Sequence, residues 1–170
     1  LLVAVVCAAP FVSAWIAYYF VKPSGGNSYG ELLPTQPLTQ VTIPGETTPE
    51  SPKAKWRMVL MFPDACGKPC EDLLYSTRQA RTMLGRDKDR VLRVVVANDK
   101  LPADVTAANP DVIVLPTGAS QVPTDWRAQL DRGVLLIDPI GNQVILWSRS
   151  PDIKKLHNDL ARLLRASRIG

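Results

Sequence analysis

The sequence predicts an α/β domain in which a mixed β-sheet is covered by helices on both faces. Apolar, β-rich runs at residues 56–62 and 91–97 have the composition of buried central strands, and a helical pattern of apolar residues separates them. Residues 134–147 form two further β-rich runs around a turn rich in Pro and Gly, and an amphipathic helix follows them. A strand–helix–strand unit followed by a hairpin and a closing helix gives a mixed sheet between helices.

Residues 1–21 are expected to form a transmembrane anchor. They carry no charged side chain, and about 20 apolar residues suffice for a helix to cross a bilayer. Trp15, Tyr18 and Tyr19 gather at the end of this block, just before Lys22, and such aromatic residues favour the membrane interface. The alternative is a cleaved signal peptide, but its apolar region spans only about 7–15 residues and small residues precede its cleavage site. An uncleaved anchor is therefore favoured.

Residues 22–54 are expected to form a linker. Pro and Gly recur throughout, and this density excludes a long helix because proline removes a backbone donor and clashes with the preceding turn. The linker would act as a spacer that lifts the domain off the membrane. Within it, residues 29–38 are expected to pack back on the domain as an extended segment.

Residues 55–170 are expected to form the folded domain. After the first strand, apolar residues at helical spacing predict a helix that ends at Gly85. The elements expected after the second strand are a short helix at 102–108, a short strand at 112–115, a helix at 123–130, a hairpin with its turn at 138–142, and a last helix opened by Pro151 and Asp152. This order of elements is that of the thioredoxin-like architecture.

Composition and charge exclude several classes of protein. Hydrophobic residues make up 46% of the chain and charged residues 21%, which is too apolar for a disordered protein. The net charge is +4, from 20 basic and 16 acidic residues, and opposite signs alternate at residues 86–90. A nucleic-acid-binding protein would gather its basic residues on one face with aromatic residues among them, so nucleic acid is not an expected partner. Zinc is not expected, because no second Cys or His pair is available to complete a site.

The candidate catalytic residues are Cys66 and Cys70, which follow the first central strand where the next helix starts. Four residues of helix rise about 6 Å, which lies within the Cα separation of about 4.4–6.8 Å that a disulfide accepts. A thiol at a helix N-terminus has a lowered pKa, so Cys66 is expected to attack and Cys70 to resolve. Lys68 adds a nearby positive charge, and the two thiolates would also suit copper(I), a soft ion that prefers sulfur.

An inert structural disulfide is the alternative for this pair. It would close only a very short loop, which stabilises a fold little, so a chemical role is favoured. Among the other candidates, Asp64 is expected to cap the thiol helix, with tuning of the Cys66 thiol as the alternative, and His157 is expected to be an ordinary surface residue of the last helix.

Six features of the sequence point to one family: Lys55-Trp56 at the start of a strand, Phe62 near its end, the Cys66-x-x-x-Cys70 pair, Leu136-Ile137-Asp138-Pro139-Ile140-Gly141, Tyr29-Gly30-Glu31-Leu32-Leu33, and residues 163–170. Together these segments resemble the Sco-type copper chaperones. The last two are similar to a bacterial subgroup of small, membrane-anchored Sco-like proteins. The resemblance covers roughly residues 29–170, and the thiol motif is its most specific part.

This resemblance implies a role in cytochrome c oxidase assembly at the bacterial inner membrane, with the domain in the periplasm. The domain would deliver copper(I) to the binuclear copper centre of the oxidase, or reduce that centre's cysteines. The chain departs from the Sco pattern at two places. Glu71 stands where Sco proteins have proline, and residues 120–135 contain no histidine where Sco proteins have a copper ligand. Thioredoxins instead have a cis-proline there, and Arg132-Gly133 offers none.

Three hypotheses follow for the function. The first is a Sco-like assembly factor for cytochrome c oxidase that works through the thiols, with copper(I) as a cargo. The second is a general periplasmic thiol–disulfide oxidoreductase that serves several exported thiol proteins. The third is a non-catalytic interaction domain with a thioredoxin fold. Partner range separates the first two, and the solvent accessibility of Cys66 separates both from the third.

Overall fold

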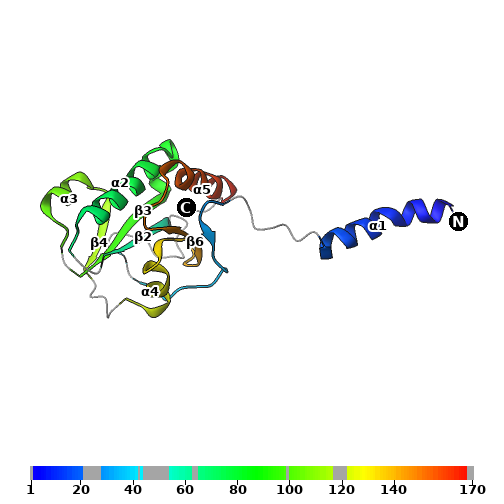
Figure 1. The fold of residues 1–170 in the computed structure, drawn as a ribbon, viewed down its shortest axis with the longest axis horizontal. Helices are drawn as coiled ribbons and strands as arrows, with labels where there is room; N and C mark the ends of the chain where they lie inside the picture. Colours follow the sequence, from blue (N-terminus) through cyan, green and yellow to red (C-terminus); the bar gives the residue numbers. More distant parts are fainter. Residues whose placement is uncertain are drawn as a thin grey trace.

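The computed structural model describes residues 2–20, 28–41, 43, 54–62, 65–98, 100–116 and 122–167 (Figure 1). The chain begins with helix α1 (Leu2–Phe20), which contains Pro10 and has no acidic residue in its first turn and no basic residue in its last. The segment expected as a transmembrane anchor is thus helical. Among the described residues, no helix combines the length and the apolar character that crossing a membrane requires.

A six-stranded mixed sheet forms the centre of the domain, in the order β1-β6-β5-β2-β3-β4. β2 (Trp56–Phe62) runs parallel to β3 (Val91–Ala97), which runs parallel to β4 (Val112–Pro116). β5 (Gly133–Ile137) is antiparallel to both β2 and β6 (Gln143–Ser148). Every side chain of β2 and β5 is buried, as expected for strands with helices on both faces. The predicted mixed sheet is confirmed.

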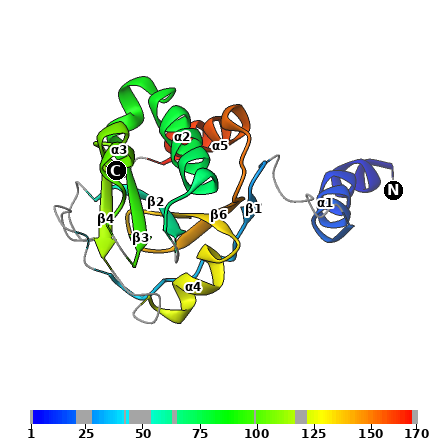
Figure 2. The same ribbon diagram turned by 60° about the vertical axis from the view of Figure 1, so that its left-hand side comes forward.

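The helices cover the two faces of the sheet unequally. α2 (Lys68–Thr82) and α5 (Ile153–Ala166) lie side by side on one face, and α4 (Thr124–Leu130) lies on the other (Figures 1 and 2). The short helix α3 (Ala103–Ala108) flanks α2, and a 3-10 helix, η1 (Gly85–Arg90), leads from α2 into β3. These elements agree with the helices and strands predicted for residues 56–164.

Two apolar clusters hold the helices to the sheet. One lies beneath α2 and α5 and includes Leu74 and Leu156, and the other lies beneath α4 and includes Trp126 and Leu130. Successive side chains of a strand point to opposite faces, so each central strand contributes to both clusters. This explains why the two central strands are continuously apolar in sequence instead of alternating.

Residues 28–41, called the N-terminal strap below, pack along the edge of the domain. Within the strap, β1 (Glu31–Leu32) pairs with β6 in antiparallel register. The backbone N–H of Leu33 donates to the carbonyl oxygen of Val144 at 2.9 Å, and the side chain of Leu38 is buried in the α4 cluster. Residues 29–38 therefore lie within an extended segment that packs on the domain.

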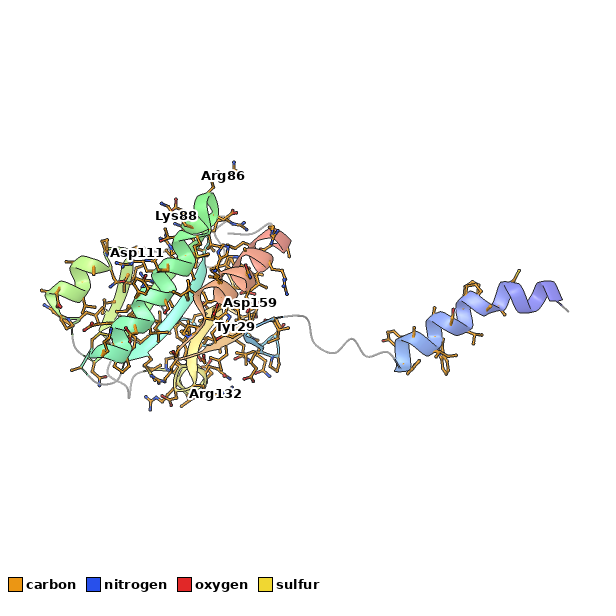
Figure 3. The ribbon with its side chains drawn as sticks, turned by 45° about the horizontal axis from the view of Figure 1, so that its top comes forward. Tyr29, Arg86, Lys88, Asp111, Arg132 and Asp159 are labelled. Atoms are coloured by element: carbon orange, nitrogen blue, oxygen red, sulfur yellow. A yellow bond between two sulfur atoms is a disulfide. The ribbon has the colours of Figure 1, made fainter. Side chains whose placement is uncertain are left out.

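A buried carboxylate on α5 fastens the strap to the domain. Asp159 is 3% exposed and accepts hydrogen bonds from the backbone N–H groups of Tyr29 at 3.1 Å and Gly30 at 2.9 Å. It also accepts one from the indole nitrogen of Trp147 at 3.0 Å. Figure 3 shows Tyr29 and Asp159 together. Because these donors satisfy the buried charge, the strap is part of the folded structure.

A buried arginine ties the thiol-bearing helix to the sheet. Arg93 of β3 is fully buried, and its guanidinium donates to the Leu74 carbonyl oxygen of α2 at 2.6 Å and to the Asn109 amide oxygen at 3.1 Å. It also pairs with Asp111 at 3.0 Å. Burial lowers the pKa of Arg93, and the charge of Asp111 opposes this shift. One side chain thus connects β3, α2 and the segment before β4.

Gly133 is the position where β5 and β6 approach too closely for a side chain. A Cβ atom there would lie 1.8 Å from the carbonyl oxygen of Trp147. We therefore expect Gly133→Ser to force the strands apart and to lower the free energy of unfolding by about 2 kcal/mol, as measured by urea denaturation. Gly67→Ser is the matched control, since a Cβ atom at Gly67 meets nothing within 4 Å. Equal effects of the two substitutions would contradict this account of Gly133.

Candidate functional site

The thiol pair lies at the carboxyl end of the central strand β2, where the chain crosses to α2. Cys66 and Cys70 are joined by a disulfide, and their Cα atoms are 5.2 Å apart. This separation lies inside the range of about 4.4–6.8 Å that disulfides accept. The pairing expected from the spacing is therefore present, and the catalytic roles of the two residues stay a prediction.

One detail of the predicted geometry is wrong, because Cys66 lies outside the helix. α2 begins at Lys68, and the N-cap residue Gly67 has an extended backbone, so Cys66 reaches Cys70 from the preceding loop instead of from the same helical face. Pro69 lies in the first turn, where a proline costs the helix no hydrogen bond.

The start of α2 uses its own backbone to satisfy its first donors. The N–H groups of Cys70 and Glu71 donate to the Gly67 carbonyl oxygen at 2.9 and 3.1 Å, and no side chain of Gly67 is available to cap. Asp64, the expected cap, lies outside the described residues. Within the described residues, the helix N-terminus beside the thiols therefore has no side-chain cap at Gly67.

The two cysteine residues differ in exposure. Cys70 is 4% exposed and belongs to the apolar cluster beneath α2, whereas Cys66 is partly exposed between Ala65 and Gly67, both exposed. An external thiol or disulfide can therefore approach Cys66 but not Cys70. This asymmetry is the one that an attacking and a resolving cysteine require.

The charges around the thiols partly cancel. The ammonium group of Lys68 lies 2.6 Å from a carboxylate oxygen of Asp72, and this pairing raises the pKa of Lys68. Glu71 adds a second carboxylate in the first turn of α2. The positive charge that Lys68 was expected to offer Cys66 is therefore balanced by Asp72. The N-terminus of α2 remains as the main group that favours a thiolate at Cys66.

The single histidine does not join the two thiols in a metal site. His157 is half-buried on α5, which is more buried than expected, and its Nδ1 has no hydrogen-bond partner in the described part of the chain. Across that part of the chain, no three His, Cys, Asp or Glu side chains are grouped to hold a metal ion. Among the described residues, the two sulfurs are therefore the donors that the site offers copper(I), and in this structure they are bonded to each other.

The structure contains a groove beside the thiols that the sequence did not predict. Its volume is about 200 Å³, and its lining comes from two helices: Glu71, Tyr75 and Arg78 of α2, Asp104, Val105 and Ala108 of α3, and Asn109. The first three residues recur at helical spacing, and this spacing is the one local feature of the sequence that places them on the same face of a helix. The opposite wall comes about 30 residues later, as the contact between Arg78 and Ala108 shows, so no local pattern indicated a groove.

The fold and the sequence define the class of this protein. A family model described as the transmembrane-like, thioredoxin-like, C-terminal domain matches residues 56–167, and the chain belongs to that family. The match includes both cysteines and every element from β2 to α5. No curated protein matches the chain in sequence.

Solved Sco structures share this fold. Copper-bound ScoI of Arabidopsis thaliana is similar with a TM-score of 0.54 and 18% identity, over 67% of this chain and 86% of that one. Apo Sco1 of Thermus thermophilus is similar with a TM-score of 0.53 and 18% identity, over 84% of this chain and 99% of that one. Copper-bound ScoI of Bradyrhizobium japonicum has a TM-score of 0.51 and 14% identity, over 78% of this chain and 98% of that one. At these identities the similarity establishes a shared thioredoxin-like fold.

Proposed function

We propose that this chain is a membrane-anchored, Sco-like assembly factor for cytochrome c oxidase that works by thiol–disulfide exchange through Cys66 and Cys70. The observation that carries the proposal is the unequal exposure of the two disulfide-bonded cysteine residues at the carboxyl end of β2. The thioredoxin-like fold shared with Sco proteins supports it, as does the thiol motif. The partner would be an oxidase subunit or another exported thiol protein.

The exchange reaction needs only the two thiols and a partner disulfide. The Cys66 thiolate attacks one partner sulfur, so that a Cys66–partner disulfide forms while the partner's disulfide breaks and its other sulfur leaves as a thiolate. Cys70 then loses its proton to solvent and attacks the Cys66 sulfur, which releases the partner as a dithiol. Two electrons pass from the cysteine pair to the partner. The reverse sequence would oxidise a partner dithiol.

Copper(I) is proposed as a minor cargo. Two thiolates can bind this ion, but a neutral imidazole as third ligand would hold it more firmly. His157 is the only histidine of the chain, and it does not group with the two cysteines in this structure. The donor set therefore favours thiol exchange over copper delivery.

A competition titration separates these two activities. We expect the reduced chain to lose copper(I) readily to a chelator, and we expect His157→Ala to leave the competition curve unchanged. Absorbance of the copper(I)–chelator complex is the measurement, and Cys66→Ser is the control that removes one donor. Tight one-to-one binding that His157→Ala abolishes would contradict the two-sulfur site and restore the copper-carrier role.

The membrane location is part of the proposal and rests on the sequence of residues 1–21. Their lack of charge and the aromatic residues at their end support attachment to the bacterial inner membrane, with the domain in the periplasm. We expect alkaline phosphatase fused after Gly170 to be active, and the fusion to stay with the membrane fraction after carbonate washing. A fusion that lacks residues 1–20 is the control. Activity only from a cytoplasmic reporter at the same site would contradict the periplasmic location.

A further inference from the structure

We propose that the groove between α2 and α3 binds a lysine or arginine side chain of the protein with which Cys66 exchanges disulfides. This inference rests on the proposed exchange function and names the specificity of the same site. The groove begins at Glu71, the residue after Cys70, and continues past Tyr75 to Arg78 along α2. Figure 2 shows α2 and α3 next to each other. A partner held at Cys66 would therefore pass over it.

The size of the groove suits one side chain. Its volume is about 200 Å³, below the roughly 300–1,000 Å³ of pockets that bury a whole small molecule. The exposed ring of Tyr75 forms one wall, and the buried Val105 lies in the groove on the α3 side. These apolar surfaces suit the methylene stem of a long side chain whose charged end stays near water.

The charge of the groove is complementary to a cation. Two exposed carboxylates, Glu71 and Asp104, line it. Its one positive group is the guanidinium of Arg78, which donates to the Ala108 carbonyl oxygen and lies 5.7 Å from the centre of the Tyr75 ring, so the lining keeps a net negative charge. Lys68 interacts with Glu71 from the start of α2 but forms its ion pair with Asp72, and an incoming lysine or arginine would give the two groove carboxylates a cation to pair with.

The distance between the groove and the thiols determines how many residues should separate the partner's cationic residue from its reacting cysteine. Tyr75 is five helical residues beyond Cys70, about 8 Å along the axis. The separation of 5.2 Å between the Cα atoms of the two cysteines adds at most that length. An extended peptide rises about 3.4 Å per residue, so the cationic residue should lie about four residues from the partner's reacting cysteine.

The test uses the full-length reduced protein and short peptides whose single cysteine forms a mixed disulfide with thionitrobenzoate. Attack of Cys66 on the peptide sulfur breaks that disulfide and releases thionitrobenzoate, because the thiol of lower pKa leaves faster. The peptides carry Arg, Gln or Glu four residues from cysteine, or Arg ten residues away. The absorbance of thionitrobenzoate gives the rate constant of each.

We expect the peptide with the near Arg to react about fivefold faster than the one with Glu, the size of two exposed charge contacts. We expect Glu71→Gln combined with Asp104→Asn to bring this ratio close to one, and 0.5 M salt to do the same. Asp131→Asn is the matched control: it removes an exposed carboxylate from the end of α4, on the other face of the sheet, and should keep the wild-type ratio. Equal rates for all four peptides would contradict binding of a cation in the groove but would not contradict the proposed exchange function.

A binding experiment without disulfide exchange tests the groove independently of the proposed exchange function. The oxidised protein is titrated with the same peptides carrying serine in place of cysteine, and backbone amide shifts are followed by NMR. Shifts confined to residues 71–78 and 104–109, seen with both Arg peptides and with neither the Gln nor the Glu peptide, would support the groove even if no peptide disulfide is reduced. Absence of such shifts together with charge-independent rates would overturn it.

Discussion

Cys70→Ser is expected to turn the chain into a trap for its exchange partner. The partly exposed Cys66 can still attack a partner disulfide, but the buried sulfur that would release the partner is gone. Mixed disulfides should therefore accumulate in cells and appear as bands of higher mass on non-reducing gels, which reductant removes. Because resolution is abolished and not merely slowed, we expect the trapped fraction to rise by an order of magnitude or more over wild type.

Cys66→Ser is the control, since it leaves only a buried thiol and should trap nothing. The identity of the trapped proteins separates the hypotheses: oxidase subunits alone indicate an assembly factor, and a broad set of exported thiol proteins indicates a general oxidoreductase. Equal trapping by the two variants would contradict the assignment of Cys66 as the attacking residue. No trapping by either, with slow and equal alkylation of both reduced thiols, would favour a non-catalytic interaction domain.

Arg93→Met is expected to be the most destabilising of the single substitutions considered for the folded domain. Methionine fills much of the buried volume but cannot donate the hydrogen bonds that Arg93 gives to Leu74, Asn109 and Asp111. Removing one partner of a buried, charged network costs roughly 3–5 kcal/mol, because the remaining polar groups stay buried without a partner. We expect a loss of about 4 kcal/mol in the free energy of unfolding, measured by urea denaturation monitored by Trp fluorescence.

Arg132→Met makes the same chemical change at the surface. Arg132 pairs with Glu31, and both side chains are about half exposed, so its loss should cost no more than about 1 kcal/mol. An equal effect of the two substitutions would contradict the role assigned to the Arg93 network.

The same network shows where sequence analysis succeeded and where it could not. The apolar residues of Val91–Ala97 predicted a central strand with these bounds, because a run buried on both faces needs no partner to be recognised. The burial of Arg93 inside that run was not predicted. Its partners Asn109 and Asp111 come 16 and 18 residues later and meet it only through the parallel pairing of β3 with β4. Long-range polar pairs of this kind leave no local pattern.

The candidate site follows the same division. The short spacing predicted that Cys66 and Cys70 could pair, since chain geometry alone limits their separation. The extended backbone at Gly67, which leaves Cys66 outside the helix, depends on how β2 joins α2. The i, i+4 spacing of Lys68 and Asp72 indicates their ion pair, whereas the prediction for Cys66 included only the charge of Lys68.

The hydrogen bonds between Asp159 and the N-terminal strap limit the length of free chain between α1 and the domain. Since the strap is fastened from Ser28 onward, only the steps from Phe20 to Ser28 remain to bridge the two, at most about 28 Å of fully extended chain. With the strap released, the free segment would run to Lys55 and could reach about 120 Å. Whatever holds α1 therefore confines Cys66 to a small search volume, in which a neighbouring partner is present at a high effective concentration and a distant one is out of reach. Selection by proximity, set by the Asp159 hydrogen bonds together with the pairing of β1 with β6, would act before any contact at the thiols.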